Sequence, residues 1–169
     1  MKQPVCFENY PLWMVFVSNL VSVLTYLAGA IIIFQVGVVW AVLYLIFIGA
    51  LEFKLIKGHC VDCYYYGKRC TFGKGKLSSW FFKKGNSKKF AKIKITWKNI
   101  LPDFLVSIIP ILVGIALLII NFNLLILTLI ILLIILTSAG NGFVRGALAC
   151  NHCKQRKLGC PAERLFSKK

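Results

Sequence analysis

Two long uncharged stretches dominate the pattern of hydrophobic and polar positions along the chain. Residues 9–51 contain no Asp, Glu, Lys or Arg, and neither do residues 104–144. Since about 20 helical residues cross a bilayer core of about 30 Å, each stretch is long enough for two crossings. The polar breaks QVG (35–37) and NFN (121–123) divide them. The pattern predicts four transmembrane helices, at 12–34, 38–56, 103–120 and 124–144.

The short breaks between the predicted helices leave room only for tight turns, so we expect two helical hairpins. A soluble domain of 169 residues could not cover two such long apolar stretches, which excludes that class. The fold class is therefore all-α integral membrane. Because the first residues lack the apolar core and cleavage site of a signal peptide, we expect the first helix to remain.

The basic residues predict the orientation. Of 21 Lys and Arg, one precedes residue 54, 13 lie in 54–98, none lies in 101–144 and seven lie in 145–169. The positive-inside rule places the two basic segments in the cytoplasm, and four crossings place the N-terminus there too. We expect a multi-pass protein of the cell membrane with both termini in the cytoplasm.

A cysteine motif occurs twice with the same spacing. CVDCYYYGKRC (60–70) and CNHCKQRKLGC (150–160) are offset by 90 residues, and Phe53 and Phe143 keep that offset. NYP (9–11) and NILP (99–102) each precede a predicted hairpin. The sequence therefore predicts two repeats, each a helical hairpin followed by a cytoplasmic cysteine knuckle, an arrangement known among membrane proteins. The predicted organisation is a first repeat (1–70), a basic aromatic linker (71–98), and a second repeat with a basic tail (99–169).

Each motif lacks one of the four ligands that a structural zinc site needs. Two knuckles brought together would supply six thiolates, and the basic residues beside them favour the thiolate form. The predicted metal ligands are Cys60, Cys63, Cys70, Cys150, Cys153 and Cys160.

Two C-x2-C-x6-C halves containing Lys and Arg resemble the binuclear zinc cluster of fungal transcription factors, over about 22 residues. The resemblance implies two zinc ions, with Cys60 and Cys150 bridging both. Cys63 and Cys70 would then bind one ion, and Cys153 and Cys160 the other. The halves lie far apart and membrane helices intervene, so we carry over the coordination and not the DNA binding.

Three other uses of the cysteines stay open. Disulfides are disfavoured because cytosolic thiols are kept reduced. A thiol-redox centre would use the two C-x-x-C pairs, and an iron–sulfur cluster would use thiolate ligands, with Cys160-Pro161 echoing a ferredoxin motif. His59 and His152 are possible further metal ligands. Cys6 lies outside both motifs and is expected to be a free thiol or a lipidated one.

Partners are predicted from charge and aromatic content. The net charge of +16 favours anionic lipid head groups and makes nucleic acid a less favoured partner. Trp80, Phe81, Phe82 and Trp97, among many lysines, suit a segment lying at the membrane surface. Glu52 is the sole acid of the first helix pair, and we hypothesise that it pairs with Arg145.

The predicted function is that of a small non-catalytic membrane protein. No charged residue lies within the predicted membrane core, which argues against an ion channel, a proton pump or a transporter of charged solutes. No catalytic constellation is visible, which also disfavours a lipid-acting enzyme. We expect an interaction or accessory subunit with a structural zinc–thiolate centre and a protein partner. The alternative is a membrane electron-transfer or thiol-redox protein that uses an iron–sulfur cluster or the C-x-x-C pairs.

Overall fold

The computed structural model describes residues 6–86, 90 and 97–160, without the side chains of residues 97–100. The described chain is helical and has no β-strand. Four of its helices are long and apolar enough to cross a membrane: Leu12–Phe34, Val38–Cys60, Leu101–Ile120 and Leu124–His152. The prediction of four such helices is confirmed.

The chain divides into two compact units, each described by itself. The hairpin unit consists of Leu20–Glu52 and Trp97–Gly142. The knuckle unit consists of Met1–Asn19, Phe53–Thr96 and Phe143–Lys169. Each unit thus combines segments that are distant in the sequence, whereas the predicted repeats follow the sequence order and stay a prediction.

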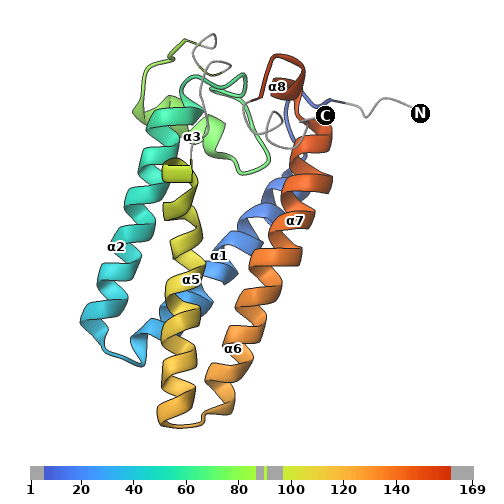
Figure 1. The fold of residues 1–169 in the computed structure, drawn as a ribbon. Coiled ribbons are helices and arrows are strands. Elements are labelled where there is room, and N and C mark those ends of the chain that lie inside the picture. The colour runs from blue at the N-terminus through green and yellow to red at the C-terminus, as the bar shows by residue number, and fades with distance from the viewer. Residues whose placement is uncertain (1–5, 87–89, 91–96, 161–169) are drawn as a thin grey trace. The chain divides into compact units, whose positions relative to one another are not determined.

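The first helix pair turns where the QVG break predicts it. Helix α1 (Leu12–Phe34) ends in two tight hydrogen bonds, from Gln35 N to Ile32 O and from Val36 N to Ile33 O. Gly37 follows with a φ of +152°, which a side chain would disfavour. Helix α2 (Val38–Leu55) then begins (Figure 1).

The second helix pair turns at the NFN break. Helix α5 (Trp97–Ile120) is followed by α6 (Leu124–Ile135), and the two pack against each other. Asn123 caps α6, since its side-chain oxygen accepts a hydrogen bond from Leu125 N at 2.9 Å. The wider helical turn η2 (Leu136–Gly140) continues α6. Helix α5 begins six residues before the predicted start. Pro102, which was expected to precede the helix, lies inside it.

Two small clusters of buried side chains form the core of the hairpin unit. One joins Ala28 and Ile32 of α1 to α6 through Ile126, Ile130 and Leu133. The other consists of Ile33, Ala41, Tyr44, Ile48 and Val106.

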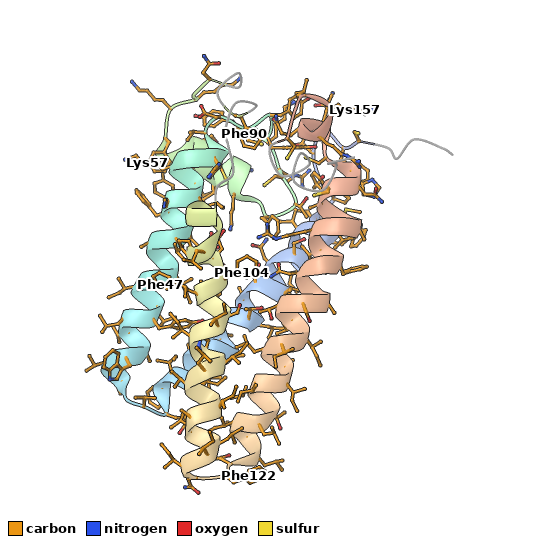
Figure 2. The ribbon with its side chains drawn as sticks, viewed as in Figure 1. Phe47, Lys57, Phe90, Phe104, Phe122 and Lys157 are labelled. Carbon is orange, nitrogen blue, oxygen red and sulfur yellow. The ribbon has the colours of Figure 1, made fainter. Side chains whose placement is uncertain are left out.

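Large apolar side chains cover the outside of the hairpin unit. Ile119 is 80% exposed and Phe122 is 70% exposed, and Phe104 is exposed as well (Figure 2). An apolar surface of this extent is a liability in water and suits contact with lipid. Four apolar helices of this length with such a surface are what a multi-pass membrane protein is expected to have.

Glu52 lies near the end of α2 within the hairpin unit. Its carboxylate accepts a hydrogen bond from the Tyr26 hydroxyl, with 2.6 Å between the oxygens. A carboxylate on an apolar helix is tolerated where a donor meets it. The hypothesised pairing of Glu52 with Arg145 stays a prediction.

The knuckle unit is built from short helical pieces. The second and fourth long helices run past their predicted ends, through the wider turns η1 (Ile56–Cys60) and η3 (Val144–Ala149). No proline interrupts either turn, so the helical backbone continues to the first cysteine of each motif. The remaining pieces are α3 (Lys74–Phe81), η4 (Cys150–His152) and α8 (Lys154–Lys157), while α7 (Asn141–Phe143) lies at the boundary with the hairpin unit. Helix α3 falls within the predicted linker.

Candidate metal centre

The first knuckle (residues 60–70) and the second knuckle (residues 150–160) have the same local fold. In each, the N–H of the second cysteine donates to the carbonyl of the first, from Cys63 to Cys60 and from Cys153 to Cys150, both at 3.4 Å. Two further backbone bonds recur at the 90-residue offset: Tyr66 to Cys63 and Lys68 to Tyr65 in the first knuckle, and Arg156 to Cys153 and Leu158 to Gln155 in the second.

The two knuckles contact each other through a reciprocal pair of hydrogen bonds. Tyr64 N donates to Gln155 Oε1 at 2.8 Å, and Lys154 N donates to Tyr65 Oη at 3.0 Å. Positions 64 and 154 are equivalent at the 90-residue offset, as are 65 and 155. In each knuckle, the backbone N–H of the residue after the second cysteine donates a hydrogen bond to a side chain of the other knuckle. The two accepting side chains, Gln155 and Tyr65, also occupy equivalent positions.

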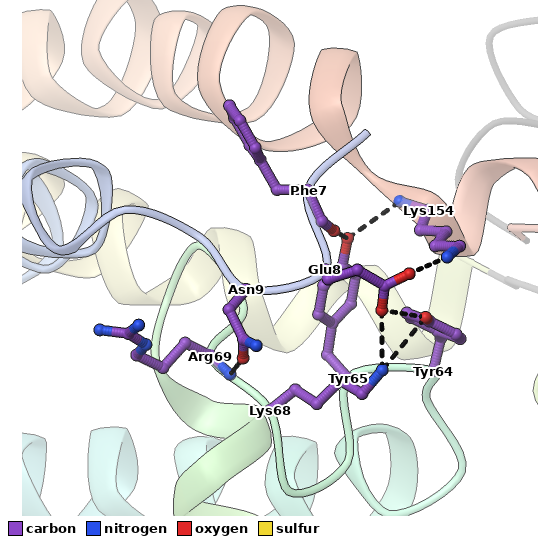
Figure 3. A network of polar contacts seen from close by, with 8 residues as sticks. All are labelled: Phe7, Glu8, Asn9, Tyr64, Tyr65, Lys68, Arg69 and Lys154. Atoms are coloured by element: carbon purple, nitrogen blue, oxygen red, sulfur yellow. Dashed lines mark hydrogen bonds and ion pairs between the residues drawn. The ribbon is translucent and has the colours of Figure 1, made fainter. Parts of the chain in front are cut away.

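The segment Phe7–Tyr10, here called the strap, lies against both knuckles. Phe7 N donates to His152 O at 3.1 Å, while Phe7 O accepts from the Tyr65 hydroxyl at 2.7 Å (Figure 3). Phe7 also forms an isolated parallel bridge with Cys153. One residue of the strap thus bonds to both cysteine motifs.

Tyr10 makes the same kind of connection at the other end of the strap. Its N–H donates to Arg69 O at 3.0 Å, and its hydroxyl donates to Ala149 O at 2.7 Å, just before the second knuckle. The side chain is 1% exposed. Burial raises the pKa of Tyr10, so its hydroxyl remains a donor far above neutral pH.

Glu8 places one carboxylate between basic residues of both knuckles. It forms ion pairs with Lys68 of the first knuckle, at 2.8 Å, and with Lys154 of the second (Figure 3). The Tyr64 hydroxyl donates to the same carboxylate. These groups are about half exposed, so the pairs add modestly to stability and weaken with salt.

The thiols of Cys63 and Cys153 are partly buried and lie close to other cysteines. The pKa of Cys63 is raised to about 11, chiefly by burial; nearby Cys153, Cys70 and Cys160 add to the rise, and a hydrogen bond from Tyr65 N–H opposes it. The pKa of Cys153 is likewise raised to about 11, chiefly by burial; hydrogen bonds from the N–H groups of Arg156 and Gln155 oppose the rise, and nearby Cys160 and Cys150 add to it. Thiols of the two motifs therefore influence each other.

Cys70 also receives a backbone hydrogen bond. Gly75 N, in the first turn of α3, lies 3.4 Å from Cys70 Sγ. A side chain at residue 75 would stand 2.1 Å from Tyr65 O, so only glycine allows this approach. Sulfurs of Cys63, Cys70 and Cys153 thus accept N–H donors, and such bonds support thiolate ligands of a metal.

The donor chemistry fits zinc, although the described side chains do not form a complete set of ligands. Among residues 6–86, 90 and 97–160, no three His, Cys, Asp or Glu side chains are grouped closely enough to hold one ion. The structure brings the six predicted cysteines into one unit. Ligation by Cys60, Cys63, Cys70, Cys150, Cys153 and Cys160 stays a prediction.

The two histidines and the seventh cysteine have distinct surroundings. His152 stacks on the Phe7 ring, with 4.8 Å between the ring centroids and 30° between the planes. His59 lies in η1, and Cys6 immediately precedes the strap. The stacking gives His152 a packing role, and its predicted role as a ligand, like that of His59, stays a prediction.

Sequence reasoning missed the strap, Tyr65 and Gln155. One signal for the strap was present, since Glu8 is the only acid before Glu52 in a chain rich in Lys and Arg. Tyr65 and Gln155 carried no local signal, because their partners lie about 90 residues away.

Comparison with known protein families, curated proteins and solved structures finds no match for this chain.

Proposed function

We propose that this is a non-catalytic multi-pass membrane protein whose knuckle unit is a zinc–thiolate module on the cytoplasmic face. The observation that carries the proposal is the reciprocal hydrogen bonding between Tyr64–Tyr65 and Lys154–Gln155, which joins two cysteine motifs 90 residues apart. The module would serve as an interaction or accessory surface for a protein partner and for anionic lipid.

The matching hydrogen bonds of the two knuckles support an internal repeat. A pseudo-two-fold axis between the knuckles would exchange residue 64 with 154 and residue 65 with 155, as the reciprocal pair requires. Parallel repeats related by an axis along the membrane normal place equivalent segments on the same side of the bilayer. Both motifs would then face the cytoplasm, as the distribution of Lys and Arg also indicates.

Zinc is the metal that this donor set supports best. Six thiolates can satisfy two zinc ions that share bridging sulfurs, which leaves no open coordination position and makes the site structural. Cys60 and Cys150, the first cysteines of the two motifs, would bridge, as in the cluster that the motifs resemble. Zinc bound across the knuckles would add its binding free energy to the stability of the unit.

Electron transfer through an iron–sulfur cluster is the alternative for the same cysteines. A thiol-redox role is less well supported, because burial raises the pKa of Cys63 and Cys153 to about 11. At neutral pH such thiols are protonated unless a metal binds, and the thiolate is the reactive form.

Metal analysis of detergent-purified protein tests the proposal. The wild type is expected to hold two zinc ions per chain and to be colourless. Cys63→Ser and Cys153→Ser should each lower the zinc content. Cys6→Ser is the matched control, because Cys6 lies outside both motifs, and it should leave the zinc content unchanged.

Two results would contradict the proposal. Brown protein with visible absorption and bound iron would establish the iron–sulfur alternative. If protein expressed in zinc-supplemented medium contains neither zinc nor iron, the cysteines do not form a metal centre.

A further inference from the structure

Helix α3 is held firmly at its first turn. Gly67 N donates to Gly75 O at 2.9 Å, and the Gly75 N–H is directed at Cys70 Sγ. Ser78, one turn later, is fully buried and donates its hydroxyl to Gly75 O at 2.8 Å. The helix therefore turns its Gly75 and Ser78 face to the first knuckle.

The end of α3 is held equally well. The Tyr66 hydroxyl donates to Phe82 O at 2.6 Å. Further along, Gly85 N donates to Val61 O at 3.0 Å, and Asn86 N donates to the Asp62 carboxylate at 2.6 Å. With both ends fixed on the first knuckle, the side chains on the opposite face of α3 have a defined direction.

That opposite face is aromatic and exposed. Trp80 is 70% exposed and Phe81 is 71% exposed, and Leu77 is partly exposed beside them. Lys76, Lys83 and Lys84 are exposed around this group. Two neighbouring large aromatic side chains that are held rigidly in water indicate a binding surface.

The aromatic face of α3 lies beside the end of a candidate membrane span. Helix α3 packs against η1, the last turn of the candidate membrane span Val38–Cys60. Phe82 also packs edge-to-face on Phe53 of the same span, with 5.5 Å between the ring centroids. Phe53 is itself largely exposed. The aromatic surface of α3 is thus continuous with the exposed apolar surface at the end of that candidate span.

We infer that α3 is a membrane-surface anchor, with Trp80 and Phe81 inserted at the head-group level of an anionic bilayer. Tryptophan is enriched at this depth because one part of its ring is apolar and another is polar. Lys76, Lys83 and Lys84 match anionic head groups in charge. A helix of eight residues is too short to cross the bilayer, so it lies along the surface.

This inference rests on the proposed membrane location and is independent of zinc. The test uses the full chain in nanodiscs of phosphatidylcholine with phosphatidylglycerol. Trp13→Phe, Trp40→Phe and Trp97→Phe leave Trp80 as the only tryptophan, whose emission is excited selectively over that of the tyrosines. Lipids brominated near the head group should quench Trp80 strongly, and aqueous acrylamide should quench it weakly. A variant that keeps only Trp40, at the start of α2, is the positive control for contact with lipid.

Two results would overturn the anchor. Quenching of Trp80 by acrylamide, with none by brominated lipid, would leave the face in water. Protection of Trp80 from both quenchers would mean that a protein surface covers it. The zinc content is measured on the same sample. If zinc is absent while brominated lipid still quenches Trp80, the metal proposal is rejected and the anchor is retained.

A second measurement avoids the tryptophan substitutions. Wild-type protein in nanodiscs that contain a photoactivatable phosphatidylglycerol should acquire lipid adducts on the peptide that includes α3, and Trp80→Ser with Phe81→Ser should abolish them. Lys83→Gln should lower adduct formation about fivefold, since one lysine near an anionic surface contributes roughly that factor. Equal labelling of the wild type and the serine variant would overturn the anchor.

Discussion

The phenolic hydroxyl of Tyr44 donates a hydrogen bond to the carbonyl oxygen of Val106, with 2.7 Å between the oxygens. In an α-helix that carbonyl accepts the N–H of the residue four positions later. In α5 this residue is Pro110, which has no N–H. The bond is buried, so the tyrosine of α2 supplies a donor that α5 lacks and that water does not replace.

Tyr44→Phe should therefore lower the free energy of unfolding by about 1–3 kcal/mol, because a buried acceptor loses its partner. Denaturant unfolding in detergent micelles measures the change. Pro110→Ala restores the missing N–H, so Tyr44→Phe should be less costly in that background. An equal cost in both backgrounds would show that the tyrosine does not compensate for the proline.

Gly29 makes room for the same hydroxyl. A side-chain carbon at residue 29 would lie 2.3 Å from Tyr44 Oη and 3.2 Å from Pro110 Cγ. Gly29→Ala should thus destabilise the protein by about 1–3 kcal/mol in the same unfolding assay. Gly49→Ala is the matched control, because nothing lies within 4 Å of its added carbon. A similar loss from both substitutions would reject the steric explanation.

Tyr65→Phe should loosen both knuckles together. The hydroxyl accepts from Lys154 N and donates to Phe7 O, so its removal leaves two backbone groups without this partner. The expected loss is about 1–3 kcal/mol. Hydrogen exchange followed by mass spectrometry should show faster exchange in residues 60–70 and 150–160.

Tyr66→Phe is the matched control for that experiment. Its hydroxyl donates to Phe82 O, at the end of α3, whereas the Tyr65 hydroxyl donates to the strap. Exchange should then rise near α3 and stay unchanged in residues 150–160. Faster exchange of the second knuckle in both variants would contradict the bridging role of Tyr65.

The knuckle unit should lose stability in alkaline solution. Burial raises the pKa of Tyr65 to about 12 from the ordinary value of 10. A group whose folded pKa is raised contributes its full stability below pH 10, and this contribution disappears as pH rises through 12. Thermal unfolding between these pH values should show a falling midpoint, and Tyr65→Phe should flatten the fall. A midpoint that drops equally in the variant would assign the effect to other groups.

The membrane helices could be predicted because their signal is local. Hydropathy and length in residues 9–51 and 104–144 give the number of helices, and QVG and NFN give the turns. The helix ends were less predictable. Pro102 was interpreted as a helix start, yet α5 includes it and accepts the loss of one backbone hydrogen bond. Turns η1 and η3 extend the second and fourth long helices as far as the cysteines. The residues of these turns have no distinctive composition that would predict the extension.

The repeated cysteine spacing predicted two similar knuckles, and their backbone bonds do match at the 90-residue offset. The strap was not predictable in the same way. Its hydrogen bonds join Tyr10 to Ala149 and Phe7 to Tyr65, and no pattern of periodicity connects residues at such separations. The side chains that complete the contact, Tyr65 and Gln155, differ between the repeats, so the spacing alone could not reveal them.

The bond from Tyr10 to Ala149 also sets an order of events during biosynthesis. The two residues are separated by 139 positions. At about 5–20 residues per second, a ribosome needs on the order of ten seconds to reach the second after making the first. During that interval Tyr10 and the first knuckle have been synthesised, but the second knuckle that they contact has not. A messenger truncated before codon 149 would yield the four apolar helices without the second knuckle or its bond to Tyr10.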